Sequence, residues 1–424
     1  DPAPGGNRPV TSAIERLTGL HWKGQGPAFL VGTGHGATHW ILGTFYVLLP
    51  YITNTLGLTY AQAGGLVTLF HVSAFIANAG SGAVVDIRGR RVLVQACSLL
   101  VGAASLMAMG LAESVLFLVP LVVLIGITNN LWHPAAISYL SQRYPRNRGY
   151  ALSVHTLGAS VGDAIAPVVA GAALLSLSWQ GTATVVSIPV LAVAALLLFA
   201  LGSEDRENGA NGTNATGKGG YLKGVAALAK DRAVIALCTM AAFRSMAQSG
   251  ILVFMPLYLA DVLKVSPIVL GLALMSMQIA GMFAGPVAGV ASDRMGRHPV
   301  ALICLTVSTL AIVALTAVSG VISFVAVATV LGLAMFAGAG AARGLLRRRP
   351  LRARRRLLRA GRVDAGRQPD CRRAGPSAGA QARRKGPVTL TTRLTERLGV
   401  AHPVLSAPMA FVGGGRLAAA VSNA

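Results

Sequence analysis

Long apolar runs alternate with short polar connections over the first 340 residues of the chain. A helix needs roughly 20 mostly apolar residues to cross about 30 Å of hydrocarbon, and a backbone in lipid must satisfy its own hydrogen bonds. The pattern therefore predicts an all-α, polytopic membrane protein. The expected spans are residues 29–52, 64–85, 92–112, 115–140, 151–175, 182–201, 234–260, 268–292, 300–318 and 320–340.

Basic residues occupy alternate connections between these spans. Arginines follow the second, fourth and eighth spans, whereas the connections after the first, third, fifth and ninth spans contain no Lys or Arg. Lys264, after the seventh span, departs from the pattern. Because cytoplasmic loops of membrane proteins are enriched in Lys and Arg, we expect a multi-pass protein of the cell (inner) membrane whose amino terminus is cytoplasmic.

The composition agrees with this class. Hydrophobic residues make up 54% of the chain and charged residues 12%, a balance that favours a lipid environment over a soluble domain. The net charge of +23 could suggest a nucleic-acid partner, but residues 341–424 hold 19 of the 37 basic residues and 3 of the 14 acids. The other basic residues lie largely between spans, so we expect the lipid bilayer, and no nucleic acid, as a partner.

A polar, Gly-rich segment separates the first six spans from the next four, and such a composition favours a flexible link. The expected organisation is a cytoplasmic segment at 1–27, a six-helix bundle at 28–201, a cytoplasmic linker at 202–233, a second bundle at 234–340, an Arg-rich tail at 341–390 and a separate fragment at 391–424.

The two bundles repeat a helix pair. Residues 58–91 and 265–298 align without a gap at an offset of 207, and Thr59 and Ser266 occupy equivalent positions as expected helix caps. Internal duplication is typical of transporters whose two halves rock around a central site. We therefore predict a transporter built from two related halves.

Two motifs within this repeat, GAVVDIRGRR at 82–91 and GVASDRMGRH at 289–298, resemble the signature of the major facilitator superfamily. The run LWHPAAISYLSQRYP at 131–145 and the Gly-rich span after it are similar to the fosmidomycin-resistance-like branch, and that span also resembles the antiporter signature. The resemblance implies twelve spans in two bundles, of which about ten are present. It assigns gating roles to Gly82, Asp86, Arg88, Gly89, Arg90, Arg91, Gly289, Asp293, Arg294, Gly296 and Arg297.

The resemblance stops near residue 340. Residues 343–385 hold 16 Lys or Arg where the last two spans should stand, and each Arg at mid-membrane costs about 2.5–3.5 kcal/mol. We interpret 341–390 as the product of a reading-frame slip, with a basic juxtamembrane tail as the alternative. Residues 391–424 resemble the start of a nitronate monooxygenase, a flavin enzyme, but are too short for a flavin site, so we expect no cofactor and no enzyme activity.

Ionisable groups inside spans are costly and are therefore the first functional candidates. Asp163 is the one acid well inside an expected span. It could carry a proton, cap the helix before Pro167, or pair with a base such as Arg244. Arg244 itself could instead meet an anionic substrate.

Four histidines complete the proton-coupling candidates. His35 and His39 are four residues apart and share one helical face, while His133 and His155 lie on the fourth and fifth spans. The alternative for each is an ordinary interhelical hydrogen bond. A metal pair at His35 and His39 is conceivable, but the sequence indicates no further ligand, so no metal site is expected.

Polar residues within the other spans predict a wet central cavity for a small-molecule substrate. The cavity candidates are Arg244, Asn78, Asn129, Asn130, Gln248 and Gln278. Together these features favour a secondary transporter that exports a drug or metabolite in exchange for protons. The alternatives are uptake of an organic anion, motivated by Arg244, and an inactive truncated fusion that carries a fragment of a flavin oxidoreductase.

Overall fold

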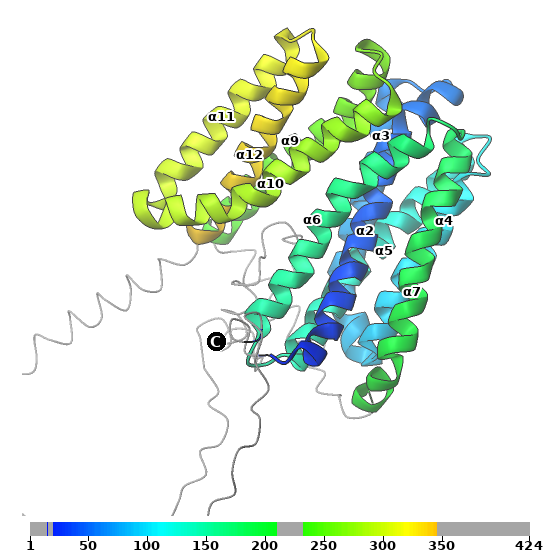
Figure 1. Cartoon of the computed structure of the whole chain (residues 1–424), viewed down its shortest axis with the longest axis vertical. Coiled ribbons are helices and arrows are strands. Elements are labelled where there is room, and N and C mark those ends of the chain that lie inside the picture. The colour runs from blue at the N-terminus through cyan, green and yellow to red at the C-terminus, as the bar shows by residue number, and fades with distance from the viewer. Residues whose placement is uncertain (1–14, 16–19, 210–231, 346–424) are drawn as a thin grey trace, which may run out of the picture.

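The computed structural model describes residues 15, 20–209 and 232–345, and within them the secondary structure is entirely helical. Each of the ten expected spans corresponds to a long helix, and η1 continues α9 by one π-helical turn (Figure 1). The elements are α2 (Trp22–Thr55), α3 (Tyr60–Arg88), α4 (Arg91–Met109), α5 (Val115–Arg143), α6 (Arg148–Ala173), α7 (Trp179–Gly209), α9 (Arg232–Leu257), η1 (Tyr258–Val262), α10 (Pro267–Met295), α11 (Arg297–Ala317) and α12 (Val321–Leu345).

The predicted fragment at 391–424 and most of the predicted tail at 341–390 lie outside the described residues, as does most of the expected linker. Helix α7 runs on to Gly209, into the segment expected as linker. Helix α12 runs to Leu345, past the position where the apolar pattern ends.

Eight of the described helices contain a stretch long and apolar enough to cross a membrane, and α12 adds the shorter apolar stretch Val321–Ala337. Helix α2, which carries His35 and His39, is not among these eight. It tolerates them because its side chains from Val31 to Thr53 are almost all buried or half-buried by other helices. The helices that contact lipid directly have no such cover and must be apolar.

Helices α2 to α7 form the first bundle, and α9 to α12 lie beside it, with α10 packed against α6 and α9 against α2 (Figure 1). The first bundle has one continuous apolar core, in which Trp132, Phe45 and Leu106 are fully buried. The second bundle has several smaller core clusters. Its helices therefore expose more apolar surface, as Leu302 and Ile322 illustrate.

The helix ends support the predicted duplication. Helices α3 and α10 both have 29 residues. Thr59 caps α3 in a reciprocal arrangement with Gln62, accepting from the Gln62 amide at 3.2 Å, whereas its equivalent Ser266 begins α10 without a side-chain cap bond. The preceding turns also match, because Gly57 and Lys264, 207 residues apart, have φ of 62° and 51°.

The two bundles meet where α6 crosses α10. Gly171 packs on the backbone of Pro267, and Gly271 packs on the backbone of Pro167, so close that a Cβ at either glycine would overlap a carbonyl oxygen. Small residues permit such approaches between membrane helices. The bundles are therefore joined at the end of the molecule where α6 ends and α10 begins.

Candidate functional site

The predicted proton-coupling residues come together inside the first bundle. We call His35 and His39 of α2, His133 of α5, and His155 and Asp163 of α6 the histidine cage. The four histidines are between 5% and 8% exposed, and the Asp163 side chain is 19% exposed. Five ionisable groups that are far apart in sequence thus share one buried site.

Glycines on α2 and α6 bring the cage together. Gly158 packs on the carbonyl of Gly32, and Gly162 packs on the carbonyl of Gly36, with no room for a Cβ at either α6 position. The cage residues alternate with these glycines along both helices. The close crossing therefore sets the distance between the side chains of α2 and those of α6.

Asp163 pairs with a histidine of the facing helix. Its Oδ1 lies 2.9 Å from Nδ1 of His39. Arg244, the base weighed from the sequence as a partner of Asp163, lies on α9 in this structure and donates to Gln248 at 3.1 Å. Asp163 contacts His39 because α6 crosses α2 closely at this point.

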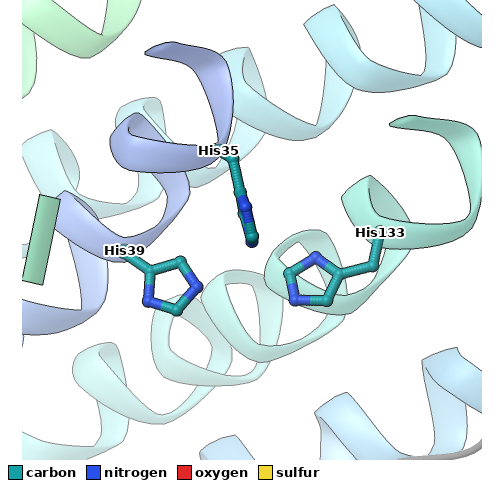
Figure 2. Close-up of side chains that lie close together, drawn as sticks. All are labelled: His35, His39 and His133. Atoms are coloured by element: carbon teal, nitrogen blue, oxygen red, sulfur yellow. The ribbon is translucent and has the colours of Figure 1, made fainter. Parts of the chain in front are cut away.

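His35 forms the centre of the cage. Its Nδ1 lies 2.7 Å from the His155 carbonyl oxygen, and because a carbonyl only accepts, Nδ1 carries the proton. The rings of His35 and His155 stack with centroids 3.8 Å apart, and His39 and His133 flank His35 at 4.8 and 5.0 Å (Figure 2).

Three ring nitrogens of the cage are buried and have no hydrogen-bond partner within the described part of the chain. They are Nε2 of His35, Nδ1 of His133 and Nδ1 of His155. An unpartnered buried polar atom costs about 1–3 kcal/mol. Such atoms cluster where a proton, an ion or a ligand is bound during function.

The polar candidates of the first bundle lie on α3 and α5. Asn129 donates to the Thr38 carbonyl at 3.4 Å, between the two cage histidines of α2. Asn130 is half-buried on α5, and Asn78 is buried on α3. Asn129 is thus the candidate that directly adjoins the cage.

The candidates of the second bundle lie on α9 and α10. Arg244 is half-buried, and one of its terminal nitrogens is buried without a partner among the described residues. Gln278 is half-buried on α10, and its Oε1 is in the same situation.

The predicted gating motifs end helices. Gly89 ends α3 in a left-handed conformation with φ of 63°, and Arg91 is buried and donates from Nε to Ser138 at 2.7 Å. Gly296 ends α10 with φ of 90°, a conformation that favours glycine. No atom of the described residues lies within 4 Å of a Cβ built at Gly289, so these residues form no close helix contact there.

The other motif residues divide into exposed ones and ones outside the description. Arg90, Asp293 and Arg294 are exposed. Nothing is described for the side chains at Gly82, Asp86, Arg88 and Arg297.

Sequence reasoning missed an acidic group that joins the bundles. Asp261 of η1 accepts from the Asn54 amide at 3.0 Å and from the Tyr60 hydroxyl at 3.2 Å. Together with Lys264 and neighbouring residues they line an open hollow of about 650 Å³. Asn54 and Asp261 differ by the repeat offset of 207, which was a usable signal.

The described helices and the polar cage between them define a multi-pass membrane transporter. A profile of the Major Facilitator Superfamily matches residues 29–354, and the chain belongs to this family. It is accordingly a transporter and not an enzyme. The family match extends past residue 340, the position near which the resemblance in the sequence was expected to stop.

Solved structures share the fold at low sequence identity. A bacterial homologue of the human lysosomal transporter Spinster, inward-facing and unoccupied, is 17% identical over 76% of this chain and 75% of that chain, with a TM-score of 0.61. A mutant of the nucleoside transporter NupG is 15% identical over 76% of this chain and 83% of that chain, with a TM-score of 0.64. No curated protein matches the chain. The fosmidomycin-resistance-like branch and the nitronate monooxygenase fragment stay predictions.

Proposed function

We propose that this transporter resides in the cell membrane with its amino terminus in the cytoplasm and exports a drug-like molecule or metabolite in exchange for protons. The single observation behind the proposal is the part-buried contact between Asp163 and His39, 2.9 Å between Oδ1 and Nδ1, inside the histidine cage. Alternating access would proceed by rocking of α2–α7 against α9–α12. The α6–α10 crossing and the Asn54–Asp261 contact would close one end.

The charge of the pair gives a reason for coupling. With His39 neutral, the pair carries one negative charge, and one added proton makes it neutral. A net charge is costly inside a helical bundle, so proton loading and release would bias the two states differently. The other titratable groups around Asp163 are His35, His133, His155 and Tyr46.

The test is proton-driven flux in proteoliposomes of the full chain. Two probes of different charge, the anionic phosphonate fosmidomycin and the cationic dye ethidium, would be followed with and without a pH gradient. We expect the wild type to transport one of them in a gradient-dependent manner, and Asp163→Asn to lose that dependence. Glu113→Gln, at an exposed acid between α4 and α5, is the matched control. Unaltered gradient dependence in Asp163→Asn would remove Asp163 from the mechanism.

Uptake of an organic anion is the second candidate. It is motivated by Arg244, whose buried terminal nitrogen has no partner among the described residues and which could bind a carboxylate or phosphonate through charge-assisted hydrogen bonds. Arg244→Gln should then abolish movement of fosmidomycin while leaving that of ethidium unchanged. Equal loss of both probes would argue against an anion site at Arg244.

A further inference from the structure

We propose that His35, His39 and His133 bind one divalent transition-metal ion inside the first bundle. One ring nitrogen from each of the three histidines lies within 4.8 Å of those of the other two. The sequence indicated only the His35 and His39 pair, and the packing of α5 on α2 supplies the third ligand. Figure 2 shows the three rings grouped around a common space, with one nitrogen of His39 directed toward the other two rings.

The spacing is close to that of an occupied site. Metal–nitrogen bonds of about 2.0–2.1 Å in a tetrahedral site put the ligand nitrogens about 3.4 Å apart. The three rings therefore need to converge by no more than about 1.4 Å, which small side-chain rotations supply. No movement of the helices is required.

The groups behind the ligands are those that metal sites use. A metal-binding histidine usually donates its other ring N–H to a carboxylate or a backbone carbonyl, which fixes the ring and the tautomer. His39 has Asp163 at Nδ1, and His35 has the His155 carbonyl at Nδ1. With Nδ1 held in this way, Nε2 of each residue would be the ligand atom.

Two of the three histidines each have one buried ring nitrogen without a hydrogen-bond partner in the described part of the chain. Nε2 of His35 and Nδ1 of His133 are buried without a hydrogen bond within the described ranges. Ordinary core histidines satisfy such atoms with neighbouring groups. A bound cation would give both nitrogens a partner. A purely structural role for these histidines leaves both nitrogens unexplained.

The donor set selects the kind of ion. Three imidazoles favour Zn²⁺, Co²⁺, Ni²⁺ or Cu²⁺ over Mg²⁺ and Ca²⁺, which prefer oxygen ligands. The Asp163 carboxylate offsets part of the charge, and a fourth coordination position stays open to water or an anion. All three ligands belong to α2 and α5, so the first bundle supplies the whole ligand set.

Equilibrium metal binding tests the proposal without a transported substrate. The full chain would be purified with a histidine-free affinity tag, stripped with a chelator and titrated with Zn²⁺, and with Co²⁺ as a spectroscopic probe of tetrahedral geometry. We expect one ion per chain and a tetrahedral cobalt spectrum. His39→Gln and His133→Gln should each weaken binding at least about 100-fold, and Asp163→Asn about 10- to 100-fold.

His71→Gln is the matched control, because His71 is an exposed histidine of α3 outside the cage. It should bind Zn²⁺ as the wild type does. Thermal unfolding of each variant identifies those that fail to fold, and Zn²⁺ should raise the melting temperature of the wild type but not of His133→Gln.

The proposal is overturned if the folded wild type binds no Zn²⁺ at micromolar concentration, or if His39→Gln and His133→Gln bind as tightly as His71→Gln. Either result leaves the proton-coupled function untouched. Conversely, metal binding without any flux of the organic probes would reject the proposed function and keep the metal site.

Discussion

The α2–α6 crossing makes Gly162→Ala the most informative single change in the first bundle. A Cβ at Gly162 would overlap the carbonyl oxygen of Gly36 and lie 2.8 Å from its carbonyl carbon. Ordinary carbon contacts are about 3.5–4.0 Å, so the helices must separate by at least about 0.7 Å. The neighbouring His39–Asp163 distance of 2.9 Å would then approach about 3.6 Å, where no hydrogen bond remains.

The energetic cost follows from three contributions. Overpacking costs about 1–3 kcal/mol, and loss of a hydrogen bond to a charged group costs about 1.5–3 kcal/mol. Alanine regains about 1 kcal/mol over glycine in a helix. We therefore expect Gly162→Ala to lower the free energy of unfolding by about 3 kcal/mol.

Reversible unfolding of the purified chain in detergent measures this change. The control is Gly65→Ala on α3, where no atom lies within 4 Å of the added Cβ, and it should stabilise the chain by up to about 1 kcal/mol. If the two alanine variants have the same stability, the close crossing does not hold the cage together and the reasoning fails.

Three further changes test other parts of the fold. Asp261→Asn removes the charge of the group that accepts from Asn54 and Tyr60. It should weaken the contact between the bundles by about 1 kcal/mol, which changes the ratio of closed to open molecules roughly fivefold. Spin labels on the two bundles should report a wider distance distribution, and an unchanged distribution would contradict a role of this contact in closing one end. Lys264→Gly should stabilise the chain by about 1 kcal/mol because φ is 51° at this residue and glycine adopts positive φ without strain. Gly57→Ala should destabilise the chain by a similar amount, so the two changes in the free energy of unfolding must have opposite signs. Tyr144→Phe removes a hydroxyl that donates to the Gly24 carbonyl at 2.7 Å and accepts from the Ala28 amide at 3.2 Å, and it should cost about 2 kcal/mol by the same measurement, with a loss under about 0.5 kcal/mol counting against the contact.

The sequence predicted the helices well because membrane spans depend on a local property. A run of apolar residues becomes a helix in lipid whatever its neighbours are, so all ten expected spans appear among the described helices. The same holds for Thr59, whose capping role depends on residues within one turn. The resemblance to the major facilitator superfamily was confirmed by a family match over residues 29–354.

The arrangement of the cage depends on contacts that no local pattern contains. His133 lies beside His35 and His39 because α5 packs on α2. Asp163 contacts His39 because the glycines of α6 lie against α2. The contact of Asp261 between the bundles was not predicted for a different reason. It lies just beyond the predicted end of the seventh span, and only the repeat offset links it to Asn54.

Helix α6 connects the cage to the boundary between the bundles. One face of α6 packs on α2 through Gly158 and Gly162, and its later turns pack on α10 through Pro167 and Gly171. Asp163 is four residues before Pro167, about 6 Å along the helix axis. A rigid helix that contacts both regions transmits a shift at either one, because packed interfaces change between discrete arrangements. Loading of the cage and rocking of the bundles are therefore expected to affect each other through α6, and Gly171→Ala, which disturbs only the α10 contact, should change the affinity of the cage for Zn²⁺ although it touches none of the ligands.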